Sequence, residues 1–192
     1  IILRVKGNKV INKGFDEGKR LSRLAWLNSD AGDDDGVSKG YLPLKVENNQ
    51  INILGRNLTV GSNGLPSSIV SYFGSSNQTI DGSGEAIVED PFRFIIEKEN
   101  GELIRLLPGD LKFTEMTDAR VRWEARSRSE DLDLEVSGEM EYDGFVDYHL
   151  KLLPGKPIKI KDIRLEIPVV NTKAHYMMGL GHEGGNRKPE WI

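Results

Sequence analysis

The sequence predicts an all-β protein, a large antiparallel β-sandwich built from two stacked sheets. Three observations support this fold class. Apolar and polar residues alternate with a period of two over many short segments, clusters of Gly, Asn and Pro separate these segments, and no segment has a helical period of any length. A dozen or more strands in one open sheet would curl or split, and two stacked antiparallel sheets avoid this. The sequence therefore indicates a fold more clearly than a function.

The alternation is clearest between Ala119 and Val169. Four apolar sets interleaved with polar residues predict four consecutive strands: Ala119, Val121, Trp123 and Ala125; Leu132, Leu134, Val136, Met140 and Tyr142; Val146, Tyr148, Leu150 and Leu152; and, after Pro154-Gly155, Ile163, Leu165, Ile167 and Val169. A period of two turns successive side chains to opposite faces, so each strand should have one face in the core and one in water. The short turns between them predict an antiparallel meander, one wall of the sandwich.

The polar residues of this meander carry opposite charges on its first two strands. The first strand has Arg120, Arg122 and Arg126, and the second has Asp133, Glu135, Glu139 and Glu141. Neighbouring antiparallel strands bring such residues together, and each pair contributes about 0.2–1 kcal/mol. We expect a solvated face of mutual ion pairs, and a sugar- or partner-binding face is the alternative.

Shorter strands are expected along the rest of the chain. In order they cover residues 2–6, 9–12, 21–27, 42–46, 51–54, 58–60, 66–73, 86–88, 92–98, 103–106, 111–116 and 175–180. The turns between them contain Gly, Asn or Pro, which suit tight turns, as in Gly61–Gly64 and Asn100-Gly101. Loops are predicted at 14–19, 28–40, 74–84 and 181–188 because breaker residues dominate there.

The bulk composition excludes several classes of protein. The chain has 192 residues, enough for one large β domain, and a net charge of −4 with both signs interspersed, which excludes the basic stripe of a nucleic-acid surface. It has no cysteine, so disulfides, zinc–thiolate sites and thiol nucleophiles are excluded. No apolar run approaches the roughly 18–20 residues of a membrane span, and no signal peptide is present. The chain starts without Met and ends at Trp191-Ile192, and we interpret it as a piece of a longer polypeptide.

An acidic loop is the first candidate site. Asp30, Asp33, Asp34 and Asp35 lie close together with glycines that allow sharp turns, and calcium is bound by several such oxygens from a flexible loop. The spacing differs from that of the EF-hand loop. The loop therefore indicates either a calcium site or a solvated turn whose Asp side chains accept hydrogen bonds from nearby backbone amides. We expect no cofactor other than calcium.

A glycine-rich segment near the end of the chain is the second candidate. Gly179, Gly181, Gly184 and Gly185 surround His182 and Glu183, and flexible backbone of this kind is typical of binding loops. Histidine and glutamate serve as proton carriers or metal ligands, although the zinc spacing His-x-x-x-His is absent. The alternative is a connector to a following domain.

Aromatic side chains would matter to a carbohydrate site, because sugar rings stack on exposed aromatic rings. Tyr41 and Tyr72 lie beside predicted loops, and Trp26 has a parity compatible with either face of its strand. Trp123 has the apolar parity of its strand and is expected in the core. We therefore predict Trp26, Tyr41, Tyr72, His182 and Glu183 as carbohydrate-binding or cleft-lining residues.

Several segments together resemble a known family. They are Leu21–Ser29 with Asp34-Asp35, Leu42–Val46, Gly64–Ile69, and Met177–Gly181 with Gly184-Gly185 and Glu190-Trp191. They resemble the β-sandwich region of bacterial glycoside-hydrolase-like proteins of the Bacteroidetes type, related to glycoside hydrolase family 123. The resemblance implies a galactose-mutarotase-like supersandwich placed before a TIM barrel that carries the two catalytic carboxylates. It also implies export to the bacterial periplasm or cell surface.

Three functions follow as expectations. The leading one is a non-catalytic sandwich domain, residues 1–192, that supports or lines the catalytic barrel of a carbohydrate-active enzyme. That barrel is the expected partner of the sandwich and would follow residue 192 in the same chain. The second is a carbohydrate-binding module. The third is a stand-alone sugar enzyme of mutarotase type, which needs a histidine acid and a carboxylate base in one groove. The histidines of the chain are His149, His175 and His182, and His149 lies near Asp147 on the polar parity of its strand.

Overall fold

The computed structural model describes residue 7, residues 36–179 and residues 182–188, which lie, apart from Gly7, in the compact unit Gly36–Ile192. The strands predicted before residue 28, Trp26 and the acidic loop of Asp30, Asp33, Asp34 and Asp35 lie outside the described residues. The prediction that the whole chain forms one domain therefore stays a prediction.

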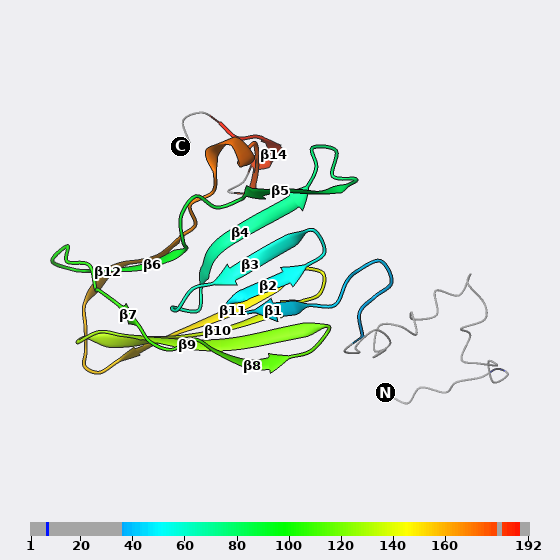
Figure 1. Cartoon of the computed structure of the whole chain (residues 1–192). Coiled ribbons are helices and arrows are strands. Elements are labelled where there is room, and N and C mark those ends of the chain that lie inside the picture. Colours follow the sequence, from blue (N-terminus) through cyan, green and yellow to red (C-terminus); the bar gives the residue numbers. More distant parts are fainter. Residues whose placement is uncertain (1–6, 8–35, 180–181, 189–192) are drawn as a thin grey trace. The chain divides into compact units, whose positions relative to one another are not determined.

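Two antiparallel sheets of five strands each form the described part of the chain (Figure 1). The first follows chain order: β1 (Lys45–Glu47), β2 (Gln50–Ile53), β3 (Arg56–Val60), β4 (Pro66–Phe73) and β5 (Ile80–Ala86). The second has β9 (Arg120–Arg128) between β10 (Leu132–Glu141) and the shorter β7 (Leu107–Pro108) and β8 (Lys112–Met116), with β11 (Val146–Pro154) at the far edge of β10.

Two smaller pairs complete the described strands. One is the antiparallel ribbon of β6 (Arg93–Lys98) and β12 (Ile160–Glu166), and the other is the pair of β13 (Tyr176–Gly179) and β14 (His182–Asn186). The helical structure of the described residues is limited to the 3₁₀ turn η4 (Asn171–Lys173). The all-β, two-sheet antiparallel sandwich predicted from the sequence is confirmed.

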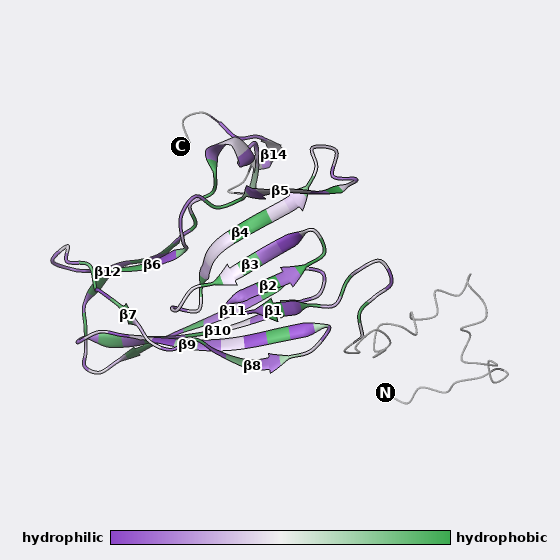
Figure 2. Cartoon of the chain, viewed as in Figure 1, coloured by the Kyte–Doolittle hydropathy of each residue, from purple (hydrophilic) through white to green (hydrophobic). Residues whose placement is uncertain are grey.

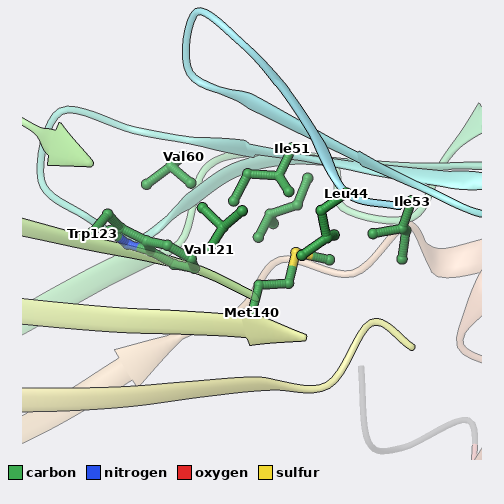
Figure 3. Close-up of a cluster of buried hydrophobic side chains, with 8 residues drawn as sticks. Leu44, Ile51, Ile53, Val60, Val121, Trp123 and Met140 are labelled. Carbon is green, nitrogen blue, oxygen red and sulfur yellow. The ribbon is translucent and has the colours of Figure 1, made fainter. Parts of the chain in front are cut away.

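The main core lies between the two large sheets (Figure 3). Ile51, Ile53 and Val60 of the first sheet and Leu44 beside it meet Val121, Trp123 and Met140 of the second, and all are at most 9% exposed. Along β9 and β10 every second residue is buried, which follows from the alternation in the sequence. Figure 2 shows the alternating hydropathy of β9 as colour bands. A second buried cluster of Leu65, Leu134 and Val136 lies toward Phe94 of β6.

Trp123 is the largest buried side chain, and two glycines fix its position. Its Nε1 donates a hydrogen bond to the Gly64 carbonyl oxygen at 2.8 Å, so its polar atom is satisfied inside the core. Gly138 lies opposite Trp123 in the ladder, and a Cβ there would come within 2.3 Å of the indole. Gly64 itself has φ +82°, as expected for the predicted Gly61–Gly64 turn. The indole therefore occupies space that Gly138 leaves open.

The predicted four-stranded meander ends one strand early. β9, β10 and β11 form it, but β12 pairs with β6 rather than with β11. The alternation of β12 suits a ladder with either neighbour, and its pairing with β6, much earlier in the chain, is a long-range choice that the local pattern does not decide. The strand was predicted correctly and its neighbour was not.

Two predicted loops contain strands. Residues 80–86 form β5, and residues 182–186 form β14, where the sequence predicted loops at 74–84 and 181–188. All seven residues of β5 are exposed. Each strand forms a ladder with one neighbour, β5 with β4 and β14 with β13. Such edge strands have no buried face and hence no alternation in the sequence to reveal them.

Candidate functional site

One side of β12 and of the segment that follows it exposes apolar residues that the sequence pattern would place in a core. Ile163, Leu165, Ile167 and Val169, here called the apolar row, share one parity and are 45%, 42%, 48% and 40% exposed. The register places Ile163 beside Ile96 and Leu165 beside Phe94 on β6. Ile96 is fully buried, so the row is covered on the β6 side and open on the β12 side.

Ion pairs occupy the even-numbered positions of β12 from Asp162 onward, and Lys161 at its β-bulge. Lys161 Nζ lies 2.6 Å from Glu97 Oε1, and Arg164 donates to Asp162 at 2.6 Å and to Glu166 at 2.9 Å. The hydrogen bond to Glu97 raises the pKa of Lys161, and those to Asp162 and Glu166 raise the pKa of Arg164. These charged groups are hydrated and have ion-pair partners. The apolar row is the part of this surface that has no such partners in the described structure.

The exposed area of the row has an energetic consequence. Full burial of a Val, Leu or Ile side chain is worth about 1.5–3 kcal/mol, so covering the remaining exposed part of each member would contribute about 1 kcal/mol. Contiguous apolar residues at this exposure are typical of an interaction surface rather than of a solvated strand. The row is therefore a candidate docking surface.

The second candidate is a groove on the outer, polar face of the second sheet. Two adjoining hollows of about 230 and 550 Å³ share Glu124, Ser137 and His149. The ladder places Lys112, Glu124, Ser137 and His149 in one row across β8, β9, β10 and β11. At about 4.8 Å between strands this central row spans roughly 14 Å.

Ion pairs on the same face lie on both sides of the central row. Arg122 donates from Nε to Glu139 at 2.5 Å and from Nη1 to Glu115 at 2.6 Å, and the hydrogen bond to Glu139 raises its pKa. On the other side, Arg126 Nη2 donates to Asp133 at 2.8 Å and Nη1 lies 3.4 Å from Glu135. The paired, solvated face predicted from the alternating charges is confirmed for these strands.

Three of the four members of the central row are unpaired among the described residues. Glu124 lies between Arg122 and Arg126 on β9, and both arginines are bound to other carboxylates. The side chains of Lys112, Glu124 and Ser137 have no hydrogen bond or ion pair among the described residues. His149 Nε2 lies 3.3 Å from Asp147 Oδ2 on its own strand and the side chain is 82% exposed. The groove therefore contains hydrogen-bonding groups that the protein does not use internally.

The residues predicted as carbohydrate contacts have separate surroundings. Tyr41 is exposed and its ring meets Tyr142 edge-on with centroids 5.2 Å apart. The Tyr72 hydroxyl accepts a hydrogen bond of 2.9 Å from Asn57 Nδ2, which makes Tyr72 part of the first sheet's packing. His182 and Glu183 lie on β14, and Glu183 is exposed. Tyr41 and Tyr72 thus have different partners, and the carbohydrate role of all four, like that of Trp26, stays a prediction.

The sequence reasoning considered His149 but missed the rest of the central row. The alternation shows that Glu124 and Ser137 lie on the solvent-facing side of their strands. Only the register of the ladders shows that they lie level with Lys112 and His149. Among the described residues, no group of three or more His, Asp or Glu could hold a metal ion, and no helix has the length and hydropathy of a membrane span.

Comparison with known proteins adds one finding. Residues 44–192 match the family model described as glycoside hydrolase 123, third domain. This range contains every described strand, and it includes both the apolar row and the groove. No curated protein and no solved structure matches the chain.

Proposed function

The chain belongs to the glycoside hydrolase 123 third-domain family, and from this premise we propose that it is a non-catalytic β-sandwich that packs against another domain of a glycoside hydrolase. The partner is the catalytic barrel expected in the same polypeptide. The apolar row of β12 is the contact surface, and its exposure is the observation that carries the proposal.

The identity of the partner follows from the family. A domain described as the third of a glycoside hydrolase is one of several domains in one chain. A covalent connection gives the partner a high effective concentration, so a small apolar surface is enough to hold it. Interfaces between domains of one chain commonly bury about 600–1,500 Å², and a strand edge with four apolar side chains is a fitting centre for one.

Substitutions in the row test this proposal. We would combine Ile163→Ser, Leu165→Ser and Ile167→Ser, and use Lys161→Ser, an exposed residue at the β-bulge near the start of β12, as the control. In the chain alone, we expect the triple variant to lose about 1 kcal/mol per substituted residue, because each side chain is about half exposed, and Lys161→Ser to unfold close to the original temperature.

The same variants are then compared in the longer glycoside hydrolase that contains the barrel. We expect the triple variant, and not Lys161→Ser, to separate the unfolding of the sandwich from that of the barrel in calorimetry and to expose the connection to proteolysis. If the triple variant unfolds in the hydrolase as the control does, β12 is not the contact surface.

The catalytic role of the barrel and export of the protein stay predictions from the family resemblance. A carbohydrate-binding role concerns a different surface of the chain, the groove on β8–β11.

A further inference from the structure

We infer that the groove on the outer face of β8–β11 is a binding site for a neutral oligosaccharide, held by the central row of Lys112, Glu124, Ser137 and His149. This inference concerns a surface separate from the apolar row and does not depend on docking. Three features of the groove carry it: its unused hydrogen-bonding groups, its rigid flanks and its charge balance.

The central row offers hydrogen bonds of every kind that a hydroxyl group needs. A carboxylate accepts, an ammonium group donates, and a serine hydroxyl and an imidazole do both. Sugar hydroxyls also donate and accept, so adjacent hydroxyls on a ring can satisfy neighbouring members of the row. Hydrogen bonds to charged groups are the stronger ones, which favours Glu124 and Lys112 as the principal contacts. An apolar ligand would desolvate these groups without replacing their hydrogen bonds.

The flanks hold the row in place. Arg122 joins Glu115 on β8 to Glu139 on β10, and Arg126 is bound to Asp133 and Glu135 on β10. Because these pairs take both arginines, Glu124 keeps its carboxylate available although it lies between two cations on its own strand. A site on the regular part of a sheet, flanked by cross-strand pairs, also loses little conformational freedom on binding.

The charge of the lining selects against anionic ligands. In the larger hollow, three cations, Lys112, Arg126 and Lys151, balance three carboxylates, Asp110, Glu124 and Glu135. In the smaller hollow, the carboxylates of Glu124, Glu139 and Asp147 outnumber the single Arg122. A phosphate, sulfate or uronate would therefore meet no net positive charge, which favours an uncharged polyhydroxyl compound over an anionic one.

The register indicates binding rather than acid–base chemistry. Glu124 and His149 lie on strands separated by β10, about 9.6 Å apart at the backbone, with Ser137 between them. A ligand that contacts all three residues must extend across the strands, as a sugar chain does. Mutarotation of a monosaccharide by this chain is thus a separate outcome that the experiment can detect.

Saturation-transfer and titration NMR on the whole chain test the site. The probes are cello-, malto- and galacto-oligosaccharides, with oligogalacturonate as the anionic comparison. We expect at least one neutral probe to bind with millimolar or tighter Kd and to shift the resonances of residues 112, 124, 137 and 149. Glu124→Ala should weaken that binding at least about tenfold, since a hydrogen bond to a charged group is lost.

Two control variants and the anionic probe make the outcome decisive. Glu47→Gln changes an exposed carboxylate on β1 of the other sheet and should leave binding unchanged, as should the triple serine variant of the apolar row. The inference is overturned if no neutral probe binds at about 10 mM, if Glu124→Ala binds as well as the original chain, or if oligogalacturonate binds better than the neutral probes. Conversion of one monosaccharide anomer into the other would replace it with an enzymatic role.

Discussion

The strands β10 and β12 have the same alternation of apolar and polar residues, but the apolar residues are buried on β10 and about half exposed on β12. On β10, Leu132, Leu134 and Val136 are at most 3% exposed. On β12, by contrast, Leu165 is 42% exposed and Ile163, which has the same parity, is 45% exposed. The difference lies in what covers each strand, because the first sheet covers the inner face of β10 and no described segment covers the open side of β12. Alternation therefore predicts an apolar face, and the partner of that face can belong to another domain.

A matched pair of leucines tests the comparison most strongly. Leu134→Ala removes a buried side chain from β10 and should cost about 2–5 kcal/mol. Leu165→Ala removes the same atoms from the half-exposed row on β12 and should cost about 1 kcal/mol or less in the chain alone. Urea unfolding of both variants gives the two values. Equal losses would mean that β12 is as fully packed as β10 and would remove the basis of the docking proposal.

The close packing on the covered side can be broken without removing any atom. Gly138→Ala would place a Cβ 2.3 Å from the Trp123 indole, and overpacking of this kind costs about 1–3 kcal/mol. Gly82→Ala on the exposed strand β5 is the control, because its Cβ would meet no atom within 4 Å. Thermal unfolding followed by tryptophan fluorescence should show a loss for Gly138→Ala only. A neutral Gly138→Ala variant would show that Trp123 can move at little cost.

Two tyrosine hydroxyls should respond with opposite signs. The Tyr148 hydroxyl is buried without a hydrogen-bond partner among the described residues, and burial raises the pKa of Tyr148 well above its usual range. Tyr148→Phe should therefore leave stability unchanged or raise it by up to about 1 kcal/mol. Tyr72→Phe removes the acceptor of Asn57, which is itself buried, and should cost about 1 kcal/mol. A destabilised Tyr148→Phe variant would indicate that a buried water satisfies that hydroxyl.

The smallest expected effect concerns pH. Asp131, between β9 and β10, lies 2.5 Å from Lys98 at the end of β6 and 3.3 Å from Lys156. The hydrogen bond from Lys98 lowers the pKa of Asp131 and raises that of Lys98. The carboxylate therefore stabilises the folded chain above its ordinary pKa of 3.8 and loses this effect as pH falls through the lowered value.

The lysine contribution has the opposite direction. It is present below the ordinary lysine pKa of 10.5 and is lost as pH rises through the raised value. Unfolding of Asp131→Asn measured between about pH 2 and pH 11 should have a flatter profile at both ends than the original chain. Identical profiles would show that solvent screens this pair completely.

The sequence was sufficient for the strands whose faces differ. The parity of Val121, Trp123 and Leu134 predicted their burial, and the opposite charges of Arg122 and Glu139 predicted their pairing. It was insufficient where the backbone alone decides. β5 has no buried residue, so its Gly and Ser residues resembled a loop, and nothing local indicated that β12 pairs with β6 rather than with β11.

The candidate sites were predictable to different degrees. Ile163 and Leu165 were recognisable as an apolar face, but exposure depends on which element covers that face, a long-range property. The central row depends on register across four strands, because a shift of one residue would turn Glu124 away from Ser137 and His149. Composition and spacing contain no information about that register, and the aromatic signal therefore led to Tyr41 and Tyr72 instead.

The most direct test of the docking account is hydrogen exchange of residues 160–169, measured in this chain alone and in a glycoside hydrolase that also contains the proposed catalytic barrel. The account predicts that the amides of β12 exchange markedly more slowly in the hydrolase, while those of β9 and β10 exchange equally in both. Equal exchange of β12 in the two proteins would contradict it, because the apolar row would then be solvated in the complete enzyme as well.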